Sequence, residues 1–109
     1  MGKSRSDSKK IPWEMVILSL LSKKDMYGSQ IAKEIKSRSG GKVAPLMGSI
    51  YPVLYKLTDN GYVKSYEKSV GRRLSVVYYR ITKKGRTEAD VLINRFHEEI
   101  SLVENFMNM

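Results

Sequence analysis

Polar-tipped side chains gather in the stretch GSIYPVLYKLTDNGY, which spans residues 48–62. Its apolar residues recur at helical spacing, so a helix would bury one stripe and expose an outward arc. Hydroxyl groups on such an arc can bond phosphate oxygens or base edges, while tyrosine and proline rings can contact thymine methyl groups and a lysine can pair with phosphate. The arc predicts a DNA-contacting surface made by Ser49, Tyr51, Pro52, Tyr55 and Lys56. The alternative for the two tyrosines is that their rings pack in a core or a dimer interface while their hydroxyl groups face water.

Pro52 indicates where this helix begins. A start near Gly48–Ser49 would put Pro52 in the first turn, where its missing N–H costs no intrahelical hydrogen bond. Backbone N–H groups around Ser49 would then point outward and offer donors to a phosphate. At the other end, Asn60-Gly61 is expected to end the helix through a left-handed residue.

A second group of cations follows, between two runs of strand-forming residues. The residues Val70-Gly71-Arg72-Arg73 read as the tip of a β-hairpin that carries adjacent cations. Arg72 and Arg73 are therefore predicted to contact DNA, and Lys64 and Lys68 on the hairpin are expected to contact phosphate loosely. The alternative is an exposed, solvated turn.

The sequence has no recognisable group of catalytic or metal-binding residues. It has one histidine, His97, no cysteine, and no carboxylate pair within a recognisable motif. The stretch Gly40-Gly41-Lys42 lacks the spacing of a phosphate-binding loop. We therefore predict no enzyme, cofactor or metal site, and we expect His97 to be a solvated helix residue.

The charge distribution and the lack of cysteine suggest partners and a compartment. Residues 1–86 carry 19 of the 20 lysine and arginine residues but six of the 11 acidic ones, whereas residues 87–109 carry one arginine against five acids. A basic body suits a polyanion, and an acidic end suits a protein partner. The longest apolar run, which begins at Met15, is too short to span a bilayer, so no membrane partner is expected. The absence of cysteine permits a reducing cytoplasm, which is where we expect the protein.

Three predicted helices precede the hairpin and one follows it. Residues 1–10 are predicted to be a disordered basic tail, and Pro12 suits the start of the first helix. A second helix should begin at Gly28 or Ser29 and end at Gly40-Gly41. The predicted fold is mainly α with a two-stranded β-hairpin, which is a winged helix-turn-helix at residues 11–82 followed by a long C-terminal dimerisation helix at residues 83–109.

The first and last helices are expected to form a dimer interface. The first helix is apolar on nearly every side, so a chain of 109 residues can hardly bury it alone. In the last helix, apolar residues recur at spacings of four and three, as in a coiled coil. The predicted interface consists of Trp13, Met15, Ile17 and Leu20, together with the seam Ala89, Ile93, Phe96, Ile100, Val103 and Met107.

Several stretches together resemble the PadR family of bacterial transcriptional regulators. These are LSKKDMYGSQIAKEI, GSIYPVLYKLTDNGYVKS, GRR and YYRITKKG, and the resemblance covers residues 15–86. The short last helix resembles the smaller PadR subfamily. One departure is the run Leu74-Ser-Val-Val77, where the family is usually shorter and more basic, so the length of the wing and the groove it enters stay open.

The resemblance implies a dimeric repressor of a two-fold operator on double-stranded DNA, which a small aromatic or cationic effector can release. It adds Tyr27 and Gly28 to the expected DNA contacts. Trp13 and Phe96 are candidates for lining an effector cavity at the dimer interface, although plain packing is the favoured interpretation of both.

The sequence therefore predicts a homodimeric, sequence-specific DNA-binding regulator. A winged-helix module that binds proteins and not DNA is the alternative.

Overall fold

The structure is a computed structural model that describes residues 11–109, so the predicted tail at residues 1–10 lies outside the described residues. Helices and strands follow one another in the order α1 (Trp13–Leu21), β1 (Met26–Tyr27), α2 (Gly28–Arg38), α3 (Met47–Asp59), β2 (Val63–Val70), β3 (Leu74–Ile81) and α4 (Lys83–Met107). Three helices followed by a hairpin confirm the predicted winged helix-turn-helix, and the long C-terminal helix is present. Among residues 11–109, no helix has the length and apolar character needed to cross a membrane.

The sheet has a third strand that the sequence did not predict. Strands β2 and β3 pair antiparallel from Val63 opposite Ile81 to Val70 opposite Leu74. The two-residue strand β1 pairs with the other edge of β3, where Met26 lies opposite Tyr79, so the strand order is β1-β3-β2. A strand of two residues is too short to show an alternating pattern, which explains why the two-stranded prediction missed it.

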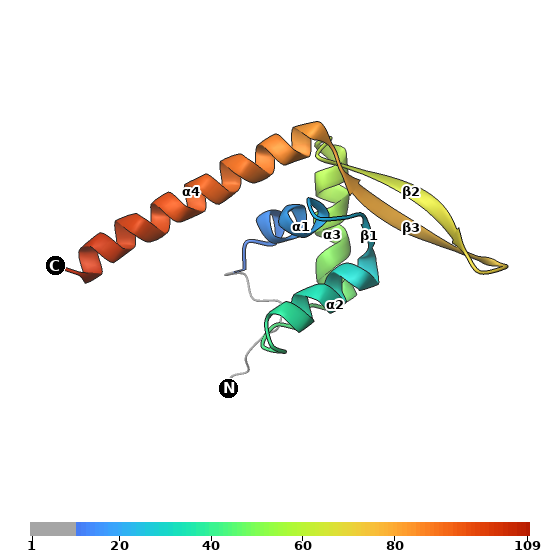
Figure 1. Cartoon of the computed structure of the whole chain (residues 1–109), viewed down its shortest axis with the longest axis horizontal. Helices are drawn as coiled ribbons and strands as arrows, with labels where there is room; N and C mark the ends of the chain where they lie inside the picture. The colour runs from blue at the N-terminus through green and yellow to red at the C-terminus, as the bar shows by residue number, and fades with distance from the viewer. Residues whose placement is uncertain (1–10) are drawn as a thin grey trace.

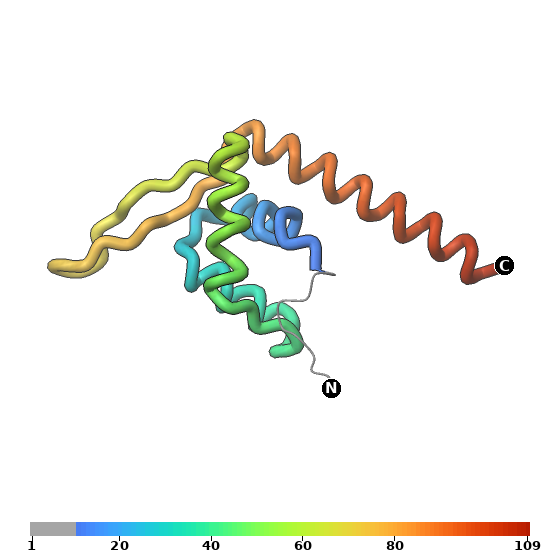
Figure 2. The backbone as a smooth tube through the Cα atoms, turned by 180° about the vertical axis from the view of Figure 1, so that it is seen from behind, coloured from blue at the N-terminus to red at the C-terminus, as the bar shows by residue number. Residues whose placement is uncertain are grey.

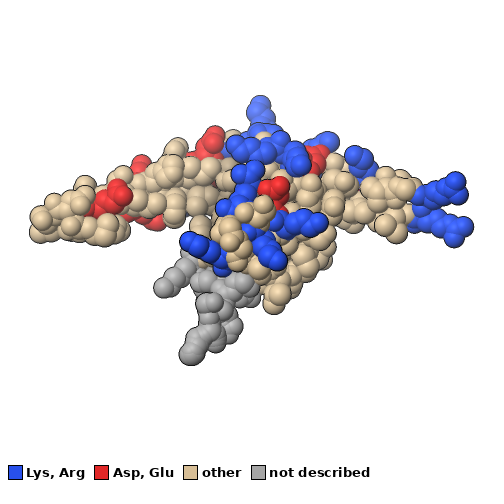
Figure 3. Space-filling view, turned by 60° about the horizontal axis from the view of Figure 1, so that its bottom comes forward, with Lys and Arg blue, Asp and Glu red and all other residues tan. Residues whose placement is uncertain are grey.

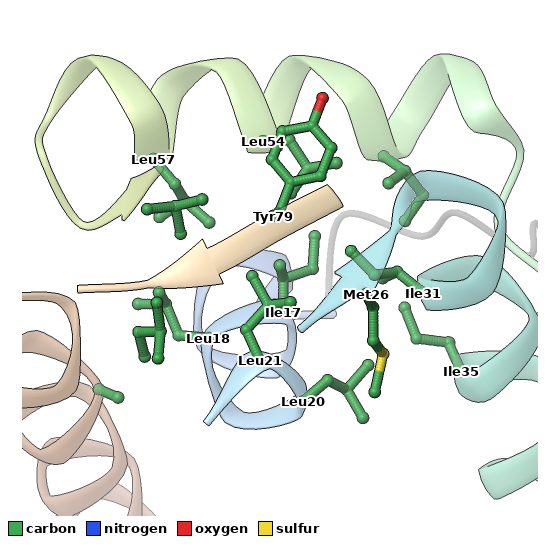
Figure 4. Close-up of a cluster of buried hydrophobic side chains, with 14 residues drawn as sticks. Ile17, Leu18, Leu20, Leu21, Met26, Ile31, Ile35, Leu54, Leu57 and Tyr79 are labelled. Carbon is green, nitrogen blue, oxygen red and sulfur yellow. The ribbon is translucent and has the colours of Figure 1, made fainter. Parts of the chain in front are cut away.

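The core lies where the three N-terminal helices meet the inner face of the sheet (Figure 4). Ile17, Ile31 and Leu54 contribute fully buried side chains from three different helices, and the ring of Tyr79 reaches from β3 towards α3. Each such aliphatic side chain contributes about 1.5–3 kcal/mol by leaving water. This packing fixes α3 against α1, α2 and the sheet, with one face left outward.

Helix α3 begins earlier than predicted. Its first residue is Met47, and Pro52 lies inside the helix, in the second turn. The backbone N–H groups of Ser49 and Ile50 both donate to the Leu46 carbonyl, at 2.9 and 3.2 Å. The prediction of a first-turn proline with an outward-facing Ser49 N–H was therefore wrong. The start was hidden because Leu46 occupies the N-cap position, and its side chain forms no cap hydrogen bond that a sequence pattern could reveal.

Glycines end α3 and turn the hairpin, as the sequence predicted. Gly61 follows the end of α3 with φ of 78°, and Gly71 lies at the hairpin tip with φ of 72°. Both values fall in the left-handed region, where a side chain would be strained. Each turn therefore depends on glycine.

The two longest elements leave the body in different directions. The first turns of α4 pack on the body, where Gly85 and Ala89 are buried, and the helix then runs outward (Figure 1). Hairpin β2–β3 projects on the opposite side, as the view from behind also shows (Figure 2). The molecule thus has a helical body that carries α3, with a wing on one side and an arm on the other.

Candidate nucleic-acid interface

The outward face of α3 carries the residues predicted to contact DNA. The side chains of Pro52, Tyr55 and Lys56 are exposed, and those of Ser49 and Tyr51 are half-buried. Tyr55 is the most open of the aromatic residues on this helix, at 59% exposed. The structure therefore brings the five predicted residues to one helix but gives them unequal access to a partner.

Tyr51 has a packing role that its neighbour Tyr55 lacks. The two rings stack with centroids 6.0 Å apart, and Tyr51 also packs against the core. Its ring covers Gly28, because a Cβ on Gly28 would lie 2.8 Å from the Tyr51 hydroxyl oxygen. The close crossing of α2 and α3 thus depends on the small size of Gly28, which is the first residue of α2 and is buried.

Lys56 already has an acidic partner within the chain. Its ammonium group lies 2.7 Å from a carboxylate oxygen of Glu14 on α1. The hydrogen bond to Glu14, together with the attraction between the two charges, raises the pKa of Lys56 above its ordinary value. This ion pair was not predicted, because nothing in the local pattern around either residue points to the other.

Tyr27 lies in an aromatic cluster on the outer face of the sheet. Its ring meets that of Tyr78 edge-on, with centroids 5.4 Å apart, and Tyr78 stacks on Tyr66 at 5.7 Å. The side chain of Lys68 lies over the Tyr78 ring, 5.3 Å from its centroid. Tyr27 is therefore half-buried at the base of the wing, beside cations of the hairpin.

A carboxylate ties the strands together at this base. Asp25 accepts a hydrogen bond from the Tyr66 hydroxyl at 2.7 Å and another from the Arg80 guanidinium at 3.1 Å. The first of these bonds raises the pKa of the Tyr66 phenol. Sequence reasoning missed this network because Asp25 is far from both partners along the chain.

Cations extend from the helical body to the tip of the wing. Arg72 and Arg73 are exposed at the tip, and Lys64 and Lys68 are exposed along β2. Figure 3 shows blue side chains at the far end of the wing and across the helical body, whereas red ones are spaced along the arm. Lys33 on the exposed side of α2 adds to the cations of the body. The arrangement provides a field that attracts a polyanion to the body and the wing.

The predicted dimer residues divide into buried and exposed sets. Ile17 has no exposed surface, and Leu20 and Ala89 are only 8% and 3% exposed, so these three side chains pack within the chain and have little surface left for a partner. They therefore belong to the core, which corrects their assignment to an interface. Trp13, Met15 and Ile93 are half-buried. The outer part of α4 exposes apolar side chains at Phe96, Ile100, Leu102, Val103, Phe106 and Met107.

Both candidate effector residues line the same cavity. It has a volume of about 440 Å³ and lies where α1, α3 and α4 meet. Its lining is Pro12, Trp13, Glu14, Met15, Val53, Leu92, Arg95, Phe96 and Glu99. The cavity therefore combines an apolar floor with two carboxylates and one guanidinium, and Glu14 connects it to Lys56 on α3.

Residues 11–109 contain no cluster of three or more histidine, cysteine, aspartate or glutamate side chains that could hold a metal ion.

Comparison with known proteins identifies the family. The transcriptional regulator PadR-like family matches residues 17–91, which is more than half of the chain. A transcriptional regulator from Clostridium thermocellum is 29% identical, with a TM-score of 0.79 over 86% of this chain and 88% of that chain. An uncharacterized protein of Lysinibacillus sphaericus is 28% identical over 94% of both chains.

A further similar structure contains DNA. Bacillus subtilis PadR, whose crystal structure is a complex with operator DNA, is 30% identical, with a TM-score of 0.67 over 73% of this chain and 45% of that chain. The matched family is one of transcriptional regulators and not of enzymes. The chain described here therefore belongs to the PadR-like family of transcriptional regulators.

Proposed function

We propose that this protein is a homodimeric repressor that binds a two-fold operator on double-stranded DNA in the cytoplasm. The observation that carries the proposal is the exposed face of α3, flanked by a cationic wing, in a chain similar to a PadR protein crystallised with operator DNA. In this arrangement α3 enters the major groove, and its outward face contacts base edges. The wing contacts the neighbouring phosphates or the minor groove.

Different side chains on α3 have different tasks in this proposal. Tyr55 contacts bases, because its exposed ring and hydroxyl can meet a thymine methyl group and a base edge. Lys56 pairs with phosphate after leaving Glu14. Tyr51 chiefly holds α3 on α2 through its contact with Gly28.

Dimerisation through α4 supplies the second α3, which contacts the second half-site of the operator. The exposed apolar side chains of the outer arm, such as Phe96 and Ile100, would be costly to leave in water and are spaced to meet a second copy. Trp13 and Met15 at the edge of the body extend this surface.

A small aromatic or cationic effector would bind in the cavity beside Trp13 and Phe96. The apolar floor suits an aromatic ring, and the carboxylates of Glu14 and Glu99 suit a cation. Because Val53 of α3 also lines this cavity, an effector there would press on the DNA-contacting helix.

The proposal is tested with an operator selected from random duplexes by the purified protein. We expect the triple substitution Ser49→Ala, Tyr55→Ala, Lys56→Ala to weaken binding about 100-fold, as loss of several groove contacts does. The control is Asn94→Ala, Ser101→Ala, Asn105→Ala, which changes exposed residues on the side of α4 opposite the apolar seam. Fluorescence anisotropy at a fixed salt concentration measures the operator affinity of the α3 variant and of the control. Intact operator affinity in the α3 variant would show that α3 is not the DNA-contacting helix, and failure to select any duplex would favour a protein-binding module.

A further inference from the structure

The exit of α3 is hydrogen-bonded to the start of α4. The Thr82 hydroxyl donates to the Gly61 carbonyl at 2.7 Å, and the Thr82 N–H donates to the Tyr62 carbonyl at 3.0 Å. The Lys84 ammonium donates to the Asn60 carbonyl at 2.9 Å. Three successive carbonyls after α3 therefore receive donors from two residues that begin α4.

Close packing reinforces these bonds. Gly85 is buried against the same turn, and a Cβ at this position would overlap the Tyr62 carbonyl oxygen and lie 2.8 Å from the side chain of Ile81. The Thr82 hydroxyl also accepts the Gly85 N–H at 3.0 Å, which caps α4. Lys84 lies over the Tyr62 ring, 5.3 Å from its centroid. We call this set, Asn60, Gly61, Tyr62, Thr82, Lys84 and Gly85, the α3–α4 joint.

The joint connects the helix that faces DNA with the helix that faces a second copy. The last carbonyls of any helix lack intrahelical donors, and they are usually left to water or to local caps. In α3 the N–H groups of Asn60, Gly61 and Tyr62 cap these carbonyls locally. The donors from Thr82 and Lys84 then bind the carbonyls of these capping residues, so the cap of α3 is itself held by the start of α4. These bonds hold the start of α4 to the end of α3, and the packing of the first turns of α4 on α1 supports the same angle.

The angle matters because α3 is fixed in the helical body and moves with it when the body turns relative to α4. Helix α3 has 13 residues, so it is about 20 Å long. A rotation of about 10° at the joint would move its far end by about 3.4 Å, which is the rise of one base pair. The far end is the N-terminal half, which carries Ser49, whereas Tyr55 lies closer to the joint and would move less.

We propose that the α3–α4 joint sets the half-site spacing that the dimer accepts. Thr82, Lys84 and Gly85 are positioning residues: they touch no DNA, but they hold the two α3 helices at one separation. The inference rests on the proposed function, since it requires a dimer that binds a two-fold operator. A stiff joint makes the protein reject operators lengthened or shortened by one base pair, and a loosened joint makes it tolerate them.

The test uses the selected operator and versions with one or two base pairs added or removed between the half-sites. For the unaltered protein we expect each one-pair change to weaken binding about tenfold or more, because the DNA must deform to fit. The spacing penalty is the affinity for the selected operator divided by the affinity for an operator changed by one base pair. The combined variant Thr82→Val, Lys84→Met should lower this penalty at least about threefold, while its affinity for a single isolated half-site stays unchanged. Thr82→Ser, which keeps the hydroxyl, should retain the original spacing profile.

The control is Lys83→Met, which removes a charge from the neighbouring exposed lysine. It should shift affinity equally for all spacings. The inference is overturned if the joint variant, shown to be folded by thermal unfolding, keeps the original spacing profile, even when it binds more weakly overall. If the unaltered protein selects no duplex at all, the proposed function fails and the inference fails with it. If the joint variant tolerates more spacings than the unaltered protein and the Lys83→Met control does not, the result supports both the proposed function and the role of the joint.

Discussion

At the scale of single residues, Glu14 and Lys56 connect α1 to the face of α3 that we propose contacts DNA. The carboxylate occupies the position on Lys56 that a phosphate oxygen would take, at 2.7 Å from the ammonium. In the proposed complex, Lys56 exchanges one anionic partner for another when DNA binds. Since Glu14 also lines the cavity beside Trp13, the same carboxylate touches both proposed binding sites.

We expect Glu14→Gln to strengthen operator binding about two- to fivefold at low salt, because Lys56 becomes available without losing an ionic partner. The gain should shrink as salt rises, since exposed charges are screened. The matched control is Glu34→Gln, which removes the partner of Arg38 on α2, now 2.8 Å away. Titrations by fluorescence anisotropy over a range of salt concentrations give both effects. Equal gains in operator affinity for the two variants would mean that only the net charge of the protein matters, and would contradict a specific contact between Lys56 and phosphate.

At the scale of elements, the wing is a long and partly apolar hairpin. Each of its strands has eight residues, so the run Leu74-Ser-Val-Val77 lengthens β3. Leu74 is 64% exposed and Val77 42% exposed, so exposed apolar side chains of β3 lie beside the exposed lysines of β2 and the cationic tip. Contacts between Asp25 and residues of β2 and β3 hold the base of this ribbon.

We expect Arg72→Ala, Arg73→Ala to reduce the slope of log affinity against log salt by about two, because each phosphate contact of a cation contributes about 0.9. The two substitutions should weaken all duplexes alike, since phosphate contacts carry no sequence information. Lys23→Ala, Lys24→Ala is the control, with the same loss of charge at two adjacent exposed positions after α1. An unchanged slope in the wing variant would show that the tip stays clear of phosphates.

At the scale of the whole molecule, the body and the arm carry different surfaces. The chain extends over 61 × 38 × 21 Å, and much of its longest dimension comes from the wing and α4 pointing apart (Figure 1). The arm combines acidic residues with an exposed apolar seam, whereas the body and wing are basic. This separation fits the proposed dimer, in which the arm would meet a second copy while the body and wing meet DNA.

We expect Ile100→Glu, Val103→Glu to produce monomers, because carboxylates in an apolar seam would have to be desolvated without a partner. Sedimentation velocity should show the change in mass. The variant should also bind the selected two-fold operator much more weakly. In a dimer, binding of one DNA-binding domain raises the effective concentration of the other at the second half-site, and a monomer lacks this gain in affinity. Asn94→Glu, Asn105→Glu adds the same charge opposite the seam and should remain dimeric. A persistent dimer in the seam variant would place the interface elsewhere.

Much of the architecture was predictable because its signals are local. Periodic apolar residues predicted the helices, and glycines at turns predicted the hairpin. The order of these elements predicted the winged helix-turn-helix, and the sequence motifs in residues 15–86 predicted the family. The missed pieces were those without a local signal, namely the two-residue strand β1 and the start of α3 at Met47.

The sequence by itself determined the four helices, the hairpin, the basic body with its acidic arm, and the residues that lie on α3. The tertiary structure alone decided which contacts individual residues make. It separated the packed Tyr51 from the open Tyr55, paired Lys56 with Glu14, moved Ile17 and Ala89 into the core, and joined Thr82 to the exit of α3. The physical reason is that periodicity reports which face of an element is apolar, whereas contacts between distant residues depend on how the elements pack.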